Sequence, residues 1–116
     1  MSAIDESLEA AEVVVIGTPI YWYGPTGPTK LLLDRLRPYF GNRRLSGKSL
    51  ALLLPAGTGA PDCDLTIEMF RRACEALGMT FLVAVTAEAY DMGEVDTDPE
   101  VAQALDALAA TINADA

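Results

Sequence analysis

The chain has 116 residues, an apolar fraction of 51% and a formal net charge of −9, from 8 basic and 17 acidic residues. This length accommodates one domain, 1–116, and the composition favours a folded core over disorder. The acidic balance disfavours nucleic acid and anionic membranes as partners. The chain has no histidine, which excludes a Ser-His-Asp mechanism and removes the usual metal ligand, so we expect no metal site.

The first third of the chain predicts a helix end, a strand, a loop and a helix. Residues 4–11 read as the end of a helix, and 12–17 as a strand. The run Val13-Val14-Val15-Ile16 is apolar on both faces, which is typical of a strand covered on both sides in a parallel sheet. A helix is predicted to begin at Pro28 or Thr29 and to be stopped by Pro38 and Gly41.

The rest of the chain repeats this order. We predict a strand over 48–54, a loop over 55–61, a helix from Asp62 or Asp64 to Leu77, a strand over 79–86, a loop over 88–95 and a last helix capped by Thr97 or Asp98. Each connection is long enough for the next strand to return parallel, with a right-handed crossover. The sequence therefore predicts an α/β fold with three parallel strands and helices on the faces of the sheet.

The loop after the first predicted strand is the most unusual segment of the chain. It reads Thr18-Pro19-Ile20-Tyr21-Trp22-Tyr23-Gly24 and lies at the carboxyl end of a buried strand, where open α/β sheets bind ligands. The three consecutive aromatic residues offer flat apolar surface, and glycine and proline hold the backbone in an open shape. Such a loop suits a flat heteroaromatic ring.

This loop, together with the following Gly27-Pro28-Thr29-Lys30 and Asp34-Arg35, resembles the NAD(P)H-dependent FMN reductase branch of the flavodoxin-like proteins. Leu52-Leu53-Leu54-Pro55-Ala56-Gly57-Thr58-Gly59 resembles the next strand and the Gly-rich, flavin-facing loop of that family. The resemblance runs from about residue 11 to 95. It implies a three-layer flavodoxin-like parallel sheet, FMN as cofactor, NAD(P)H as substrate and flavin oxidoreductase activity.

The resemblance also implies the cofactor-binding residues, which are Thr18, Pro19, Tyr21, Trp22, Tyr23, Gly24, Ala56, Gly57, Thr58 and Gly59. Backbone amides near Thr18, Gly24 and 57–59 would donate to the polar edge of the flavin, and glycine would permit close approach. We expect no catalytic side chain, because a flavin itself carries hydride-transfer chemistry.

Members of the family begin with a strand, a phosphate-binding loop, a helix and a second strand, none of which is recognised before Val13. We therefore expect a partial flavodoxin-like domain, truncated to about three strands, with weak or absent FMN and reduced activity. One alternative is a non-catalytic fragment or subunit that acts through self-association or a partner chain. Another is a flavodoxin-like module without flavin, such as a receiver domain.

A homo-oligomer is expected, because the first strand would otherwise be an exposed apolar edge. No apolar stretch is long enough to span a membrane and no signal peptide is recognised, so we expect a cytoplasmic protein without a membrane partner. Weaker assignments are Tyr90 and Asp91 as further lining of the site, Arg43 and Arg44 as contacts for a phosphate of NADPH or as a solvated turn, and Cys63 and Cys74 as buried small hydrophobes.

Overall fold

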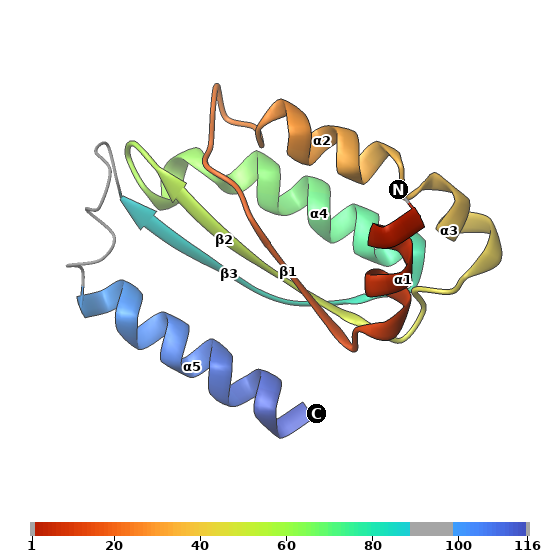
Figure 1. The fold of residues 1–116 in the computed structure, drawn as a ribbon. Coiled ribbons are helices and arrows are strands. Elements are labelled where there is room, and N and C mark those ends of the chain that lie inside the picture. The colour runs from red at the N-terminus through yellow and green to blue at the C-terminus, as the bar shows by residue number, and fades with distance from the viewer. Residues whose placement is uncertain (1, 89–98, 116) are drawn as a thin grey trace.

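A computed structural model describes residues 2–88 and 99–115 of the chain. Its centre is a sheet of three parallel strands, β1 (Val13–Gly17), β2 (Ser49–Ala56) and β3 (Thr80–Glu88). The strands lie in chain order, with β1 paired to β2 and β2 paired to β3 (Figure 1). The predicted α/β fold with a three-stranded parallel sheet is confirmed.

Helices cover both faces of this sheet and make it the middle of three layers (Figure 1). The helices that precede β3 in the chain lie on one face, and the last helix lies on the other. The helices of the first face are α1 (Ser2–Ala10), α2 (Gly27–Asp34), α3 (Arg37–Asn42) and α4 (Asp64–Leu77), and a short 3₁₀ turn, η1 (Ala60–Asp62), precedes α4. The opposite face carries α5 (Pro99–Asp115), which contacts β3.

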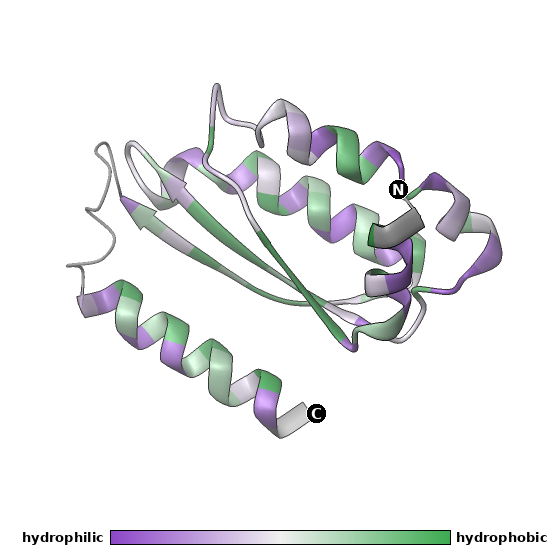
Figure 2. Ribbon diagram, viewed as in Figure 1, coloured by the Kyte–Doolittle hydropathy of each residue, from purple (hydrophilic) through white to green (hydrophobic). Residues whose placement is uncertain are grey.

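The strand β2 is buried on both sides, as its apolar run predicts. Leu50, Leu52 and Leu54 pack against α4, whereas Ala51 packs toward α5. The predicted helix that ends at Leu77 is confirmed as α4. It has one buried side, since Phe70, Cys74 and Leu77 are buried and Ile67 packs against them. In Figure 2 the strands are largely green, whereas α4 alternates green and purple as a helix with one buried side does.

The prediction that the first strand is covered on both sides is wrong. Val14 and Ile16 pack into the core on the α4 side, but Val15 points the other way and is 44% exposed. The cause is the position of α5, which lies along β3 and leaves β1 open on that face (Figure 1). An apolar strand sequence shows that both faces can be buried, and it does not show which helix covers them.

Other predicted boundaries also change. The third strand, predicted over 79–86, runs from Thr80 to Glu88, so Glu88 belongs to β3 and not to the loop after it. Pro38 does not end the preceding helix; it lies in the first turn of α3, where a residue without an N–H is tolerated, and Gly41 lies inside that short helix. The second strand continues through Pro55 to Ala56, so both belong to β2 and not to the loop after it. Within residues 2–88 and 99–115, none of the helices combines the length and the apolarity needed to cross a membrane.

Candidate functional site

Two loops at the carboxyl edge of the sheet form the candidate site. The chain after β1 stays paired to the end of β2, because the amide of Thr18 donates to the carbonyl of Leu53 at 3.0 Å and that of Ile20 to Pro55 at 3.1 Å. The loop after β2 begins beside these bonds. The structure therefore brings residues 18–24 and 57–59 to the same edge (Figure 1).

The three aromatic residues form a tight turn. Tyr21 and Gly24 exchange two backbone hydrogen bonds, of 2.9 and 3.1 Å, so Trp22 and Tyr23 are the two residues at the tip. Their φ angles are 52° and 67°. This left-handed region suits Gly or Asn, and a bulky residue there costs roughly 1 kcal/mol or more. We call residues 21–24 the aromatic turn.

The aromatic turn presents its rings to solvent. Tyr21 is 64% exposed, Trp22 95% and Tyr23 55%. Trp22 therefore lies at the mouth of the site and not in the core, as its place after a strand end suggests. A flat ligand that covered these rings would bury a large apolar area.

Buried threonine side chains support the turn from below. Thr18 and Thr66 are each only 1% exposed. The amide of Thr26 donates to the hydroxyl of Thr18 at 3.1 Å, and Thr26 in turn caps α2. The hydroxyl of Thr66 donates to the carbonyl of Tyr23 at 3.4 Å. Thr66 was not among the predicted site residues. Thr18 was predicted as a cofactor-binding residue, and the side chain of Thr18 lies inside the protein.

The second loop is closed by its own hydrogen bonds. The amide of Gly59 donates to the carbonyl of Ala56 at 3.2 Å, and that of Thr58 donates to a carboxylate oxygen of Asp62 at 3.1 Å. The buried thiol of Cys63 donates to the carbonyl of Gly59 at 3.4 Å. Gly59 has a φ of 76°, and a Cβ there would lie 3.4 Å from the Cβ of Glu88, so both backbone shape and space favour glycine.

These bonds change which amides are available to a ligand. The amides of Thr18, Gly24, Thr58 and Gly59 all have partners within the protein. In the described part of the chain, the amides of Trp22, Tyr23 and Gly57 have none. Three donors thus remain, two on the aromatic turn and one at the start of the second loop.

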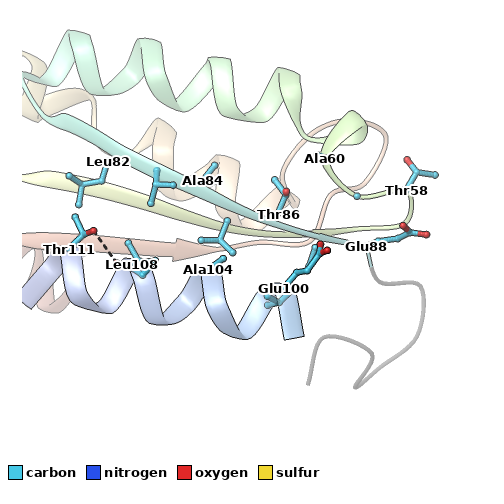
Figure 3. A pocket seen from close by; sticks show the side chains of 16 residues that line it. Thr58, Ala60, Leu82, Ala84, Thr86, Glu88, Glu100, Ala104, Leu108 and Thr111 are labelled. Carbon is cyan, nitrogen blue, oxygen red and sulfur yellow. Dashed lines mark hydrogen bonds between the residues drawn. The ribbon is translucent and has the colours of Figure 1, made fainter. Parts of the chain in front are cut away.

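Two hollows adjoin these loops. An apolar pocket of about 350 Å³ lies beneath the first loop, between the strand ends and α5, and is lined mainly by Thr18, Pro19, Leu53, Pro55, Val101 and Leu105. A groove of about 670 Å³ runs from Thr58 along β3 and α5. Figure 3 shows Thr58, Thr86, Glu88 and Glu100 at one end of this groove and Leu82, Ala84, Leu108 and Thr111 farther along it.

The carboxyl edge of the sheet is acidic. None of the eight basic residues of the chain lies within 18–29 or 55–63, and Lys30, the first one after the aromatic turn, pairs with Asp34. Arg43 and Arg44 lie at the opposite end, where Arg43 caps the carbonyl of Ala76 at 2.7 Å and Arg44 pairs with Glu9 at 3.3 Å. This position removes them from the candidate site.

Other chemistry finds little support. Both cysteines are buried and unpaired, as expected. Burial and the nearby carboxylates of Asp62 and Asp64 raise the pKa of the Cys63 thiol, so it stays neutral and is a poor nucleophile. Across the described residues, no cluster of acidic or cysteine side chains could hold a metal ion. Tyr90 and Asp91, and the predicted caps Thr97 and Asp98, lie outside the described residues.

This geometry suits the ring of a flavin mononucleotide better than its phosphate. Exposed rings on a preset turn, three amides without partners and a Gly-containing loop match a flat ring with a polar edge. The described loops offer no cation for a phosphate.

Comparison with known families identifies the family of the chain. The model of a family described as NADPH-dependent FMN reductase matches residues 1–92. The chain belongs to the NADPH-dependent FMN reductase family. Comparison with curated protein sequences gave no match.

Solved structures support the flavodoxin-like fold of this FMN reductase family member. The Trp repressor binding protein from Bacillus subtilis matches with a TM-score of 0.81 and 24% identity over 89% of this chain. General stress protein 14 from Treponema denticola, solved in complex with FMN, matches with a TM-score of 0.61 and 20% identity over 72% of this chain. An NADPH-quinone reductase from P. pentosaceus matches with a TM-score of 0.66 and 18% identity over 90% of this chain. The chain spans 67%, 56% and 68% of the lengths of these three proteins, respectively.

Proposed function

We propose that the chain is an NAD(P)H-dependent flavin oxidoreductase that holds the flavin ring between the aromatic turn and the loop 57–59. The observation that carries the proposal is the turn itself, in which three rings are exposed at the ligand edge of the sheet and two of them, Trp22 and Tyr23, stand on a strained backbone. Strain of this kind persists where the surrounding structure holds it, and it occurs most often at ligand sites.

The proposed contacts divide into ring surface and backbone donors. Tyr21, Trp22 and Tyr23 would cover the apolar face of the ring, and the amides of Trp22, Tyr23 and Gly57 would donate to its polar edge. The full set of proposed binding residues is Thr18, Pro19, Tyr21, Trp22, Tyr23, Gly24, Ala56, Gly57, Thr58 and Gly59. A bound flavin would itself supply the hydride-transfer chemistry, with NAD(P)H as the donor. The part of the protein is to bind, orient and shield the ring.

The phosphate of FMN should add little to binding. Asp62, Glu88 and Glu100 lie on the second loop and at the acidic end of the groove, and the chain as a whole carries a net charge of −9. A phosphate dianion is repelled by this field. We therefore propose weak FMN binding, no tighter than that of riboflavin.

An activity assay tests this function. Oxidation of NADPH is followed with FMN or riboflavin as acceptor, for the wild type, for a Trp22→Ala/Tyr23→Ala variant and for Phe40→Ala. Phe40 is a matched control, because it is 63% exposed but lies on α3 at the far end of the molecule. Activity that depends on the turn and not on Phe40 supports the proposal. Equal activity in all three proteins, or none in any, contradicts it.

The second candidate function is a non-catalytic subunit that acts through self-association. The observation that favours it is the open flank of β1, with Val15 exposed and, among the described residues, no strand on its outer edge. A homo-oligomer is compatible with either function.

A further inference from the structure

Asp62 closes the loop that faces the candidate site. Its carboxylate oxygen accepts the amide hydrogen of Thr58 at 3.1 Å, and its own amide donates to the carbonyl of Gly59 at 3.1 Å. A backbone donor at the ligand edge is thus occupied by a side chain of the same loop. Of the two partners, Thr58 is exposed to solvent and Asp62 is partly exposed.

The link between Thr58 and Asp62 can open without disturbing the rest of the loop. In the described part of the chain, the Asp62 carboxylate has no other hydrogen-bond or ion-pair partner. The remaining contacts of the loop are made by Gly59, whose amide bonds Ala56 and whose carbonyl accepts from Cys63. Rotation of one partly exposed carboxylate into water therefore frees one amide and leaves the loop backbone in place.

We propose that Asp62 is a displaceable cap, whose carboxylate stands where a carbonyl oxygen of a ligand ring would accept from Thr58. This inference rests on the proposed flavin site and adds a specificity-determining residue to it. A ligand must compete with the carboxylate for this amide. Asp62 therefore lowers the affinity for the ligand in proportion to the fraction of molecules in which the amide is free. Its charge also penalises an anionic acceptor more than a neutral carbonyl, so Asp62 favours rings whose acceptor at this position is uncharged.

Riboflavin is the probe, since it carries the ring without the phosphate. Asp62→Ala should bind riboflavin about fivefold more tightly than the wild type or better, because a hydrogen bond to a carboxylate no longer competes. Asp62→Asn keeps an acceptor without charge and should fall between the two. Asp64→Asn is the matched control, because Asp64 is exposed in the first turn of α4 and, among the described residues, its carboxylate accepts only from the neighbouring amide of Leu65, at 2.9 Å.

A second measurement does not depend on any ligand. Amide hydrogen exchange at Thr58 should be faster in Asp62→Ala than in the wild type and unchanged in Asp64→Asn, provided that all variants give the wild-type circular dichroism spectrum. Equal exchange in the wild type and Asp62→Ala would overturn the inference, whatever riboflavin does.

The binding outcomes separate this inference from the function on which it rests. If the wild type binds riboflavin and Asp62→Ala binds it no more tightly, the cap is overturned and the site stands. If none of the proteins binds riboflavin, the site itself is overturned and the inference falls with it. Tighter binding by Asp64→Asn equal to that of Asp62→Ala would assign the gain to lost charge alone and would also overturn the cap.

Discussion

The hydroxyl of Thr66 donates to the carbonyl of Tyr23, 43 residues earlier in the chain, at 3.4 Å. Thr66 is buried in the first turn of α4, and Tyr23 is at the tip of the aromatic turn. This bond ties the ligand edge of the first loop to the helix that follows the second. The helix α4 and the turn before it therefore fix the position of the two loops of the candidate site relative to each other.

Removal of that hydroxyl should loosen the site. Thr66→Val keeps the side-chain volume but leaves the Tyr23 carbonyl without its partner, so the free energy of unfolding should fall by about 1 kcal/mol. Riboflavin should also bind more weakly, since the rings are less well placed. Thr111→Val is the control, because the Thr111 hydroxyl donates to the carbonyl of Ala107 within α5, at 3.0 Å, away from the two loops. Denaturant unfolding and a flavin titration measure both effects; unchanged binding in Thr66→Val would show that the bond does not serve the site.

Replacement of the two strained residues of the aromatic turn should raise the stability of the fold and abolish riboflavin binding. Replacement of Trp22 by Asn together with Tyr23 by Gly gives the residues that a two-residue turn with two positive φ angles prefers. We expect the free energy of unfolding to rise by about 1 kcal/mol, because the strain is relieved, and riboflavin binding to be lost with the rings. A less stable double variant would mean that packing of the two rings outweighs the strain of the backbone.

Alkaline pH should destabilise the fold through its buried thiols. Burial raises the pKa of the Cys74 thiol from an ordinary 9.0 to about 11. Above pH 9 the unfolded chain loses this proton while the folded chain keeps it, so stability falls as pH rises from 9 to 11, by no more than about 1.4 kcal/mol per pH unit from this group. Cys74→Ala should show a shallower fall over that range in urea unfolding. Identical slopes for the two proteins would show that Cys74 does not titrate in this window.

Self-association through the open flank of β1 should depend on Val15. A lysine there places a charge on an apolar strand edge, a feature that blocks strand addition. We expect light scattering to give a dimer or larger assembly for the wild type and a smaller species for Val15→Lys. Val83→Lys makes the same change at a 38% exposed site on β3 and should leave the assembly intact. A monomeric wild type would argue against the oligomer.

The sequence predicted the parts of the fold that local pattern determines. The strand predicted over 48–54 and the helix predicted to end at Leu77 correspond to β2 and α4, and both were confirmed. The end of the helix predicted from Pro28 or Thr29 was placed wrongly because Pro38 can either stop a helix or start one, and here it lies in the first turn of α3. The exposure of the Val15 face of β1 was not predicted, because it depends on the position of α5.

The candidate site was predictable in composition and not in geometry. The aromatic run and the Gly-rich loop are visible in the sequence, whereas the support from Thr66 joins residues far apart in the chain. The turn at Trp22 and Tyr23 carries no sequence signal, because such turns usually contain Gly or Asn. The closure of Thr58 by Asp62 lies within five residues, but an aspartate before a helix reads first as a helix cap.

The most direct test of the flavin site is a calorimetric titration of riboflavin into the wild type and Trp22→Ala, followed in parallel by fluorescence of the wild type, whose single tryptophan is Trp22. We expect riboflavin to quench Trp22 and Trp22→Ala to bind it more weakly by about 1 kcal/mol or more, the contribution expected of one stacked ring. Phe40→Ala should bind as the wild type does. Binding without quenching, or equal affinity in Trp22→Ala, would place the flavin away from the aromatic turn and would contradict the proposed site.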